Sequence, residues 1–276
     1  MRIYRYGLLG VLLAGNVLAD EAAQRYGCER PIRVAMQENV IAYRDGKGFE
    51  PDFIAELQKR SGCTFEARLI PRSAAWEGLA DGSLDMVATG VPTVQRRQLA
   101  YFVPSLFYRN KLIVSVALAP RIVSFTDFQN IPDVHLGALR GLWNGPYYEG
   151  TLRMLKGMGR VHEYSSDAER FAALRSGEVS AVIAHDMNLN LMLPLEEQLR
   201  YRVLDLNPGP SLPVGMLLSR RSFDGAQAAA WLRLAETMRL DGGLARLIRK
   251  NMPAHLLEEF LHSGYRYDVS KRSSTP

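Results

Sequence analysis

The chain has little of what marks a protein that binds nucleic acid or a structural metal. Its 276 residues include only two cysteines, and its 34 basic residues exceed its 29 acidic residues by five. Both signs of charge are interspersed, and no long run of one sign precedes the short Lys271-Arg272 pair near the end. So small an excess gives no basic patch for a nucleic acid. His135, His162, His255 and His262 lack the spacing of a metal site, so we expect no metal and no cofactor.

Long apolar runs are also absent, apart from one near the start. Arg2 and Arg5 precede a run from Gly7 to Leu18, which leads into Val17-Leu18-Ala19. The run is well short of the roughly 20 apolar residues that a membrane span needs. Basic residues, a short apolar run and small residues in this order are typical of a secretory signal peptide. We therefore expect residues 1–19 to be removed on export, with no lipid anchor because no cysteine follows the run closely.

The two cysteines lie in similar places. Cys28 precedes a predicted strand over residues 32–36, and Cys63 precedes another over residues 64–70. Cysteines of an exported protein meet an oxidising compartment. The sequence therefore predicts a disulfide between Cys28 and Cys63.

Between the ends, short β-rich runs alternate with amphipathic segments. A helix over about residues 51–60 begins with Pro51 and is followed by Gly62, and another begins at a capping box formed by Ser166 and Glu169. The alternation predicts an α/β fold with largely parallel sheets.

A short pattern occurs twice. Residues 79–87 and 174–182 each combine a helix end, a glycine and a strand, followed by polar residues at 89–90 and 185–186. Open α/β sheets bind ligands at the carboxyl ends of parallel strands. We therefore expect binding residues at both places, although two αβ corners can also be alike by chance.

Several segments, in the same order, resemble the family 3 extracellular solute-binding proteins, which bind polar amino acids for bacterial uptake systems. They are Gly-Phe-Glu-Pro-Asp-Phe at 48–53, residues 79–90, Thr-Val-Gln-Arg at 93–96 with Phe102, residues 125–141, residues 173–186 and residues 240–246. The resemblance implies the two-lobed, type II periplasmic binding protein fold, in which each lobe is a mostly parallel sheet flanked by helices. Residues 20–110 and 208–276 would form the first lobe and residues 113–206 the second, with hinge strands near 108–115 and 203–213.

The resemblance also implies a function. A monomer in the periplasm would capture a small polar solute, such as an amino acid or a related compound. It would present that solute to the membrane permease of an ABC transporter or to a membrane sensor. No nucleic-acid partner is expected.

Site residues in the first lobe follow from the same resemblance. Family members clamp the ligand carboxylate with an arginine, which corresponds here to Arg96 after Thr93, with Arg97 as the alternative. Thr89 and the backbone amides of Gly90 and Val91 would donate further hydrogen bonds.

Two aromatic residues of the first lobe have two interpretations each. Tyr43 would cover the ligand or belong to an ordinary hairpin, and Trp76 would line the cleft or pack in the core.

In the second lobe, Asp186 corresponds to the acid that pairs with the ligand's α-amino group in family members. The N-cap of the following helix is the alternative role. Gly141 is followed by Leu142 and Trp143 instead of small hydroxyl residues, so part of the carboxylate clamp is missing. Trp143, with the nearby Tyr147 and Tyr148, would then present an aromatic wall to a larger or less charged ligand.

Two alternative functions remain open. A few relatives of this fold, such as periplasmic cyclohexadienyl dehydratases, are enzymes, and Glu149 and His185 are the nearest candidates for an acid or base. Neither lies in a recognisable catalytic motif, so we expect no enzyme. The other alternative is an orphan sensor or an accessory binding protein of a periplasmic oxidation system.

Overall fold

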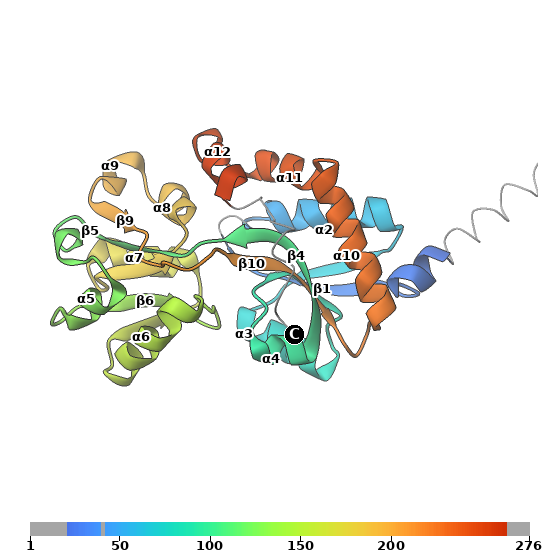
Figure 1. Cartoon of the computed structure of the whole chain (residues 1–276), viewed down its shortest axis with the longest axis horizontal. Coiled ribbons are helices and arrows are strands. Elements are labelled where there is room, and N and C mark those ends of the chain that lie inside the picture. The colour runs from blue at the N-terminus through green and yellow to red at the C-terminus, as the bar shows by residue number, and fades with distance from the viewer. Residues whose placement is uncertain (1–20, 40–41, 264–276) are drawn as a thin grey trace, which may run out of the picture.

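The computed structural model describes residues 21–39 and 42–263. The predicted signal peptide, residues 1–19, lies outside the described residues. Within them, the chain forms two α/β lobes side by side, and each lobe is built on one five-stranded sheet (Figure 1). Among the described helices, none is both long and apolar enough to cross a bilayer.

The first lobe contains the sheet with strand order β2, β1, β3, β10, β4. These strands are β1 (Ile32–Met36), β2 (Phe65–Leu69), β3 (Met86–Gly90), β4 (Ala100–Tyr108) and β10 (Leu212–Ser219). Its helices are α2 (Phe49–Ser61), α3 (Arg72–Asp81), α4 (Val94–Leu99), α10 (Gly225–Leu240), α11 (Gly243–Asn251) and α12 (Ala254–Ser263).

The second lobe contains the sheet with strand order β7, β6, β8, β5, β9. These strands are β5 (Lys111–Ser115), β6 (Leu136–Leu139), β7 (Val161–Tyr164), β8 (Ala181–Ala184) and β9 (Tyr201–Leu204). Its helices are the 3-10 helix η1 (Ala119–Arg121), α5 (Phe125–Asn130), α6 (Pro146–Gly157), α7 (Asp167–Ser176), α8 (Asp186–Met192) and α9 (Leu195–Gln198).

Both sheets have the same mixed pairing. In the first, β1 pairs in parallel with β2 and β3, whereas β10 pairs antiparallel with β3 and β4. In the second, β6 pairs in parallel with β7 and β8, whereas β5 pairs antiparallel with β8 and β9. In each sheet four strands therefore run in the same direction and one, β10 or β5, runs opposite to them, so the sheets are mixed but mostly parallel, as the sequence predicts. Helical crossovers make neighbouring strands parallel, whereas β5 and β10, which the chain enters directly after passing between the lobes, run opposite to their neighbours.

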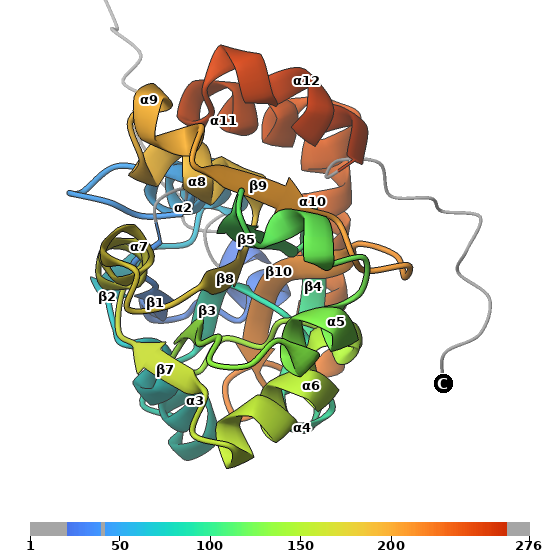
Figure 2. The same cartoon turned by 90° about the vertical axis from the view of Figure 1, so that its left-hand side faces the viewer.

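Helices cover both faces of each sheet, because buried side chains alternate along the strands. In the first lobe, Val34 packs with α2 and α10, and its neighbour Ala35 packs with α3 on the other face. In the second lobe, Leu112 packs with α5 and α6, and Ile113 packs with α7 and α8 (Figure 2).

The predicted helix near residues 51–60 is α2, and its apolar side faces the first-lobe core. Phe53 and Leu57, one helical turn apart, are fully buried. Burying a side chain of this size stabilises the fold by about 1.5–3 kcal/mol. The helix ends at Gly62, which adopts the left-handed conformation with φ 76°. The sequence therefore located this helix and its end correctly.

The predicted helix at residue 166 is α7, with one difference at its start. The Ser166 hydroxyl accepts a hydrogen bond from the Glu169 N–H at 3.2 Å, as in a capping box. The Glu169 carboxylate, however, accepts from the Ser165 N–H at 2.9 Å. The two caps therefore form at neighbouring residues instead of reciprocally.

Two connections, residues 109–110 and 205–211, join the lobes, and one arginine links them. The Arg109 Nε donates to Asp205 Oδ2 at 2.7 Å, and its terminal nitrogens donate to the carbonyls of Asn207 and Gly209. The connections are thus tied to each other. A hinge movement about them, and the lobe boundaries expected from the sequence, stay predictions.

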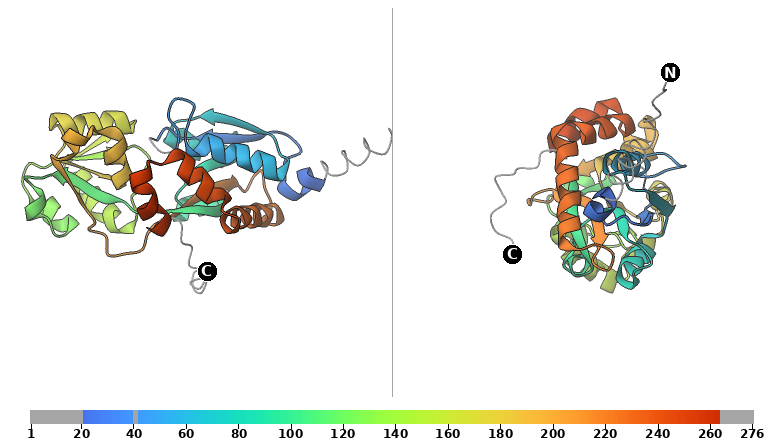
Figure 3. Two further views of the ribbon diagram at one scale, coloured as in Figure 1. Left: turned by 90° about the horizontal axis from the view of Figure 1, so that it is seen from above. Right: turned by 90° about the vertical axis from the view of Figure 1, so that its right-hand side faces the viewer.

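Helix α12 reaches from the first lobe toward the second. It lies above the junction and near α8 in Figure 1, and between the lobes in the left view of Figure 3. The Phe260 ring is buried, and its centroid is 5.9 Å from that of the His185 ring in the second lobe. One side of the junction is therefore covered by a C-terminal helix.

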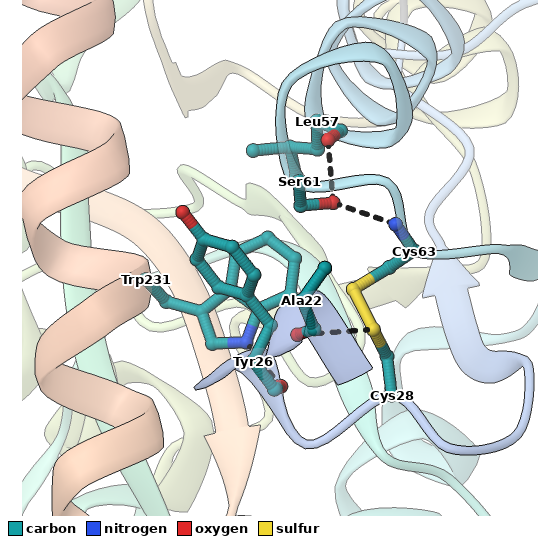
Figure 4. Close-up of a disulfide and its surroundings, with 7 residues drawn as sticks. All are labelled: Ala22, Tyr26, Cys28, Leu57, Ser61, Cys63 and Trp231. Atoms are coloured by element: carbon teal, nitrogen blue, oxygen red, sulfur yellow. Dashed lines mark hydrogen bonds between the residues drawn. A yellow bond between two sulfur atoms is a disulfide. The ribbon is translucent and has the colours of Figure 1, made fainter. Parts of the chain in front are cut away.

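The predicted disulfide between Cys28 and Cys63 is confirmed (Figure 4). It joins the segment before β1 to the turn between α2 and β2, over a separation of 35 residues. The Cys63 N–H donates to the Ser61 hydroxyl at 3.1 Å, and that hydroxyl donates to the Leu57 carbonyl at 2.7 Å. The disulfide therefore fixes the N-terminal segment to the end of α2.

Replacing both cysteines by serine should lower the free energy of unfolding by about 3–4 kcal/mol, because the unfolded chain would no longer be closed into a loop. Guanidinium unfolding of the wild type and of the C28S/C63S variant measures this difference. Adding a reductant should bring the wild type to the variant's midpoint and leave the variant unchanged. Equal midpoints under oxidising conditions would contradict the prediction.

Candidate functional site

A cavity of about 990 Å³, counting its open mouth, lies between the lobes. Its first-lobe wall includes Arg72, Trp76, Thr89, Gly90, Val91 and Arg96. Its second-lobe wall includes Leu139, Gly141, Leu142, Arg170, Met187 and Asn188. The carboxyl ends of β3 and β6 thus meet at this cavity, where an open α/β sheet binds its ligand.

Arg96 lies at the cavity and is held in place from several sides. Its guanidinium Cζ is 3.8 Å from the centroid of the Trp76 ring, a cation–π arrangement. One terminal nitrogen donates to the Val91 carbonyl at 2.9 Å, and the other crosses to the Gly141 carbonyl of the second lobe at 3.1 Å. The Thr93 hydroxyl accepts from the Arg96 N–H at 3.2 Å and so fixes the start of α4.

Burial, together with the nearby charge of Arg72, lowers the pKa of Arg96 to about 10. The group therefore remains a cation at neutral pH. Arg97, the alternative left open by the sequence, is exposed, and its guanidinium Cζ lies 5.6 Å from the centroid of the Phe102 ring outside this cavity. Of the two arginines, only Arg96 is brought to the cavity.

The Trp76 ring under Arg96 needs the glycine at position 90. A Cβ on Gly90 would lie 2.8 Å from the Trp76 ring edge and 2.7 Å from Leu217, closer than such atoms approach. Trp76 also packs beside the buried residues under α3. It therefore takes both roles that the sequence left open, because one edge of the ring packs inward while the ring also lines the cavity.

Arg72 is a cavity residue that sequence reasoning missed. It begins α3, directly after Pro71 and the carboxyl end of β2, and one of its terminal nitrogens donates to the Gln37 side-chain oxygen. Burial lowers the pKa of Arg72, although the charges of Asp167 and Glu50 oppose this. Its position just after the carboxyl end of a strand could have identified Arg72 as a candidate binding residue from the sequence.

Arg170 and its partners form a second group that was missed. The Arg170 side chain is almost fully buried, pairs with Asp167 and donates to the Ile183 carbonyl at 2.8 Å. The other Asp167 oxygen accepts from the Asn188 amide at 3.1 Å. Both oxygens of this carboxylate are therefore engaged within the second lobe.

Asp186 does not line the cavity. It lies in a smaller hollow next to α12, where its Oδ2 is 2.6 Å from Lys111 Nζ. Burial alone would raise the pKa of Asp186, but the hydrogen bonds and charges of His185 and Lys111 hold it well below its usual range. The N-cap of α8 is His185, whose Nδ1 accepts from the Met187 N–H at 3.2 Å. Asp186 is thus the first helical residue instead of the cap.

Two further predicted contact residues also lie away from the cavity. Tyr43 pairs with Asn39 in a hairpin and packs against the first-lobe core, and the cavity wall there is formed by Asn39 and Ala42. Trp143 does not line the cavity either, and Leu142 takes that place. A binding role for Tyr43 and Trp143 stays a prediction without support from their positions.

The tyrosines that follow Trp143 belong to the second lobe's interior. The Tyr147 hydroxyl accepts from the Phe125 N–H at 3.2 Å, and Tyr148 is fully buried with its hydroxyl 3.3 Å from the Asn110 carbonyl. Leu142 leaves the wall apolar at this point, so the expected aromatic wall is not formed by these residues.

The acid–base candidates from the sequence are used for local structure. Glu149 Oε1 accepts from the Asn144 N–H at 2.7 Å at the start of α6, and His185 caps α8. Neither lines the cavity. Among the described residues, no group of three or more His, Cys, Asp or Glu side chains could hold a metal ion.

Comparison with known proteins identifies the family. The model of the bacterial extracellular solute-binding proteins, family 3, matches residues 32–254. The chain belongs to this family. No curated protein matches the sequence at a significant level.

Three solved structures show how this family 3 protein compares with others. An ancestral amino acid-binding protein, a precursor of cyclohexadienyl dehydratase, is 20% identical and covers 85% of this chain and 99% of its own, with a TM-score of 0.65. The arginine-, lysine- and histidine-binding protein of Geobacillus stearothermophilus is 18% identical, covers 83% and 100%, and has a TM-score of 0.65. A histidine kinase sensor domain is 14% identical, covers 82% and 97%, and has a TM-score of 0.66. At such identities the likeness establishes the two-lobed fold alone.

Glu50, behind the first-lobe wall, gives a pH-dependent prediction. It is fully buried and accepts from the Gln37 N–H at 2.9 Å and from the Thr89 hydroxyl. Burial raises the pKa of Glu50 from 4.5 to about 7. Between these values the folded protein keeps a proton that the unfolded chain has released. The free energy of unfolding should therefore fall by roughly 2–3 kcal/mol as the pH rises from about 5 to about 7.

The Glu50→Gln variant tests this, because glutamine imitates the protonated carboxyl. Its amide can accept from the Gln37 N–H and donate to the Thr89 hydroxyl. Denaturant unfolding across this pH range should show a smaller decline for the variant than for the wild type. Parallel curves would assign the decline to other groups, such as the histidines.

Proposed function

We propose that this solute-binding protein captures a small polar solute bearing a carboxylate, an amino acid or a related compound, in the cavity between its lobes. The observation that carries the proposal is the placement of Arg96. Its guanidinium Cζ lies 3.8 Å from the centroid of the Trp76 ring at the cavity wall, and its terminal nitrogens donate to backbone carbonyls of both lobes. A planar guanidinium has five donors, so it can receive a carboxylate in addition to these two carbonyls.

Backbone of β3 adds to this site. Thr89, Gly90 and Val91 all line the cavity beside Arg96. Amides at the end of a strand can donate to the same carboxylate oxygens, and the absence of a side chain at Gly90 leaves space for this approach. The site so formed spans both lobes, and closure of the lobes around a ligand would change the distance between them.

The proposed setting is the periplasm, after export directed by residues 1–19. A monomer would deliver its solute to the permease of an ABC transporter. A membrane sensor is the second candidate for the partner, because a histidine kinase sensor domain shares this fold.

Capture without chemistry is the favoured interpretation. Glu149 accepts from the Asn144 N–H just before α6, His185 caps α8, and both lie outside the cavity lining. The rival interpretation, a dehydratase-like enzyme, comes from the ancestral precursor of cyclohexadienyl dehydratase that shares the fold. The protein should leave prephenate and arogenate unchanged when it is incubated with either compound. Formation of product would overturn the interpretation as a binding protein without catalysis.

Replacing Arg96 by alanine should strongly weaken carboxylate binding. A charge-assisted hydrogen bond contributes about 1.5–3 kcal/mol, so loss of the guanidinium should weaken binding by about tenfold to more than a hundredfold. Thermal shifts with amino acids and small carboxylates measure this, since a ligand at a hundred times its dissociation constant adds about 2.7 kcal/mol of stability.

The matched control is Arg97→Ala, which removes an exposed guanidinium from the same helix. This variant should show the same ligand-induced thermal shifts as the wild type. Retained binding in Arg96→Ala with loss in Arg97→Ala would move the clamp to the neighbouring residue.

A further inference from the structure

The cavity has an uneven distribution of charge. Three arginines line it, Arg72, Arg96 and Arg170. The described lining residues include no aspartate and no glutamate. The wall that a ligand meets is therefore cationic where it is charged, and apolar around Leu139, Leu142 and Met187.

The acids near the cavity do not neutralise all three arginines. Asp167 is buried and pairs with Arg170, so this cation has its own counter-ion. Glu50 is fully buried and bonded to Gln37 and Thr89. Among the described residues, no carboxylate lies within 4.0 Å of the Arg72 or Arg96 guanidinium. The charges of Asp167 and Glu50 act on Arg72, and that of Glu149 acts on Arg96, but neither of these two cations forms an ion pair with a described residue.

These two cations lie close enough to affect each other. Arg96 donates to the Gly141 carbonyl at 3.1 Å, and the Arg72 side chain also lies against Gly141, 3.5 Å from where a Cβ would be. Like charges repel more strongly in a partly buried site than in water. A ligand with two negative groups would remove this repulsion, whereas a cationic ligand would add to it.

A ligand ammonium group would meet no acid in the described wall. Asp186, the residue expected to receive it, lies in the separate hollow with Lys111. Burial of an ammonium beside unpaired guanidinium groups is costly unless a carboxylate accompanies it.

We propose that the ligand is a small organic dianion without an ammonium group, in which one carboxylate binds Arg96 and the second negative group binds Arg72. This inference rests on the proposed function, and it assigns Arg72 as the residue that determines specificity. The apolar wall of Leu139, Leu142 and Met187 would enclose the carbon chain between the two charged ends.

Calorimetry with succinate, glutarate and adipate, and with the monoamide of each, tests the proposal on the mature protein. In each monoamide one carboxylate becomes a neutral amide of similar size. For the best-fitting chain length, the dicarboxylate should bind at least about tenfold more tightly than its monoamide. In Arg72→Gln this preference should disappear, and monoamide binding should change little.

Arg72→Lys and Arg97→Gln are the matched variants. Lysine keeps the charge but not the fork of donors, so it should retain part of the preference. Arg97→Gln should behave as the wild type. The melting curve without ligand shows whether Arg72→Gln folds. If it does not, the comparison of Arg72→Lys with the wild type still tests the role of Arg72. An unchanged preference for the dicarboxylate over its monoamide would overturn the assignment of Arg72.

Glutarate and glutamate differ only in the ammonium group, so this pair separates the inference from the proposed function. Tighter binding of glutamate, or of lysine or a neutral amino acid, with dependence on Arg96 would overturn the dianion and leave the proposed function standing. Failure of all carboxylates and amino acids to bind would overturn both.

Discussion

A guanidinium group stays charged when it is buried, because its ordinary pKa lies far above neutrality. Three arginines line the cavity between the lobes of this protein, and among the described residues only Arg170 of the three forms an ion pair with a carboxylate. Arg96 is stabilised instead by the Trp76 ring and by two backbone carbonyls. The chemistry of the cavity follows from this imbalance, since a site rich in unpaired cations favours anions.

Packing fixes this arrangement. Gly90 leaves room for Trp76, Trp76 supports Arg96, and Arg96 reaches the Gly141 carbonyl of the opposite lobe. Because each contact depends on the one before, the position of the Arg96 guanidinium is coupled to the relative position of the two lobes. Other ties between the lobes include the Arg109 bonds within the connections, the hydrogen bond from the His185 N–H to the Tyr108 hydroxyl at 3.2 Å, and the contact of Phe260 with His185.

Local signals in the sequence predicted local structure well. Helix α2, the Ser166 cap of α7 and the Cys28–Cys63 disulfide all formed where the residues indicated them. Their physical causes act over a few residues, or over two cysteines in an oxidising compartment. The antiparallel strands β5 and β10 were harder to predict, because their direction depends on where the chain passes between lobes and not on their composition.

The sequence by itself determined the family and the two lobes, and it favoured Arg96 over Arg97, the one of the two that lines the cavity. Only the tertiary structure decided which charges meet. Arg72 and Arg170 come from helices far apart in the chain and become neighbours of Arg96 at one cavity, whereas Asp186 is drawn away by Lys111 on a neighbouring strand. A pairing of side chains over long sequence distances is set by the packing of sheets and helices, so no local pattern could have shown it.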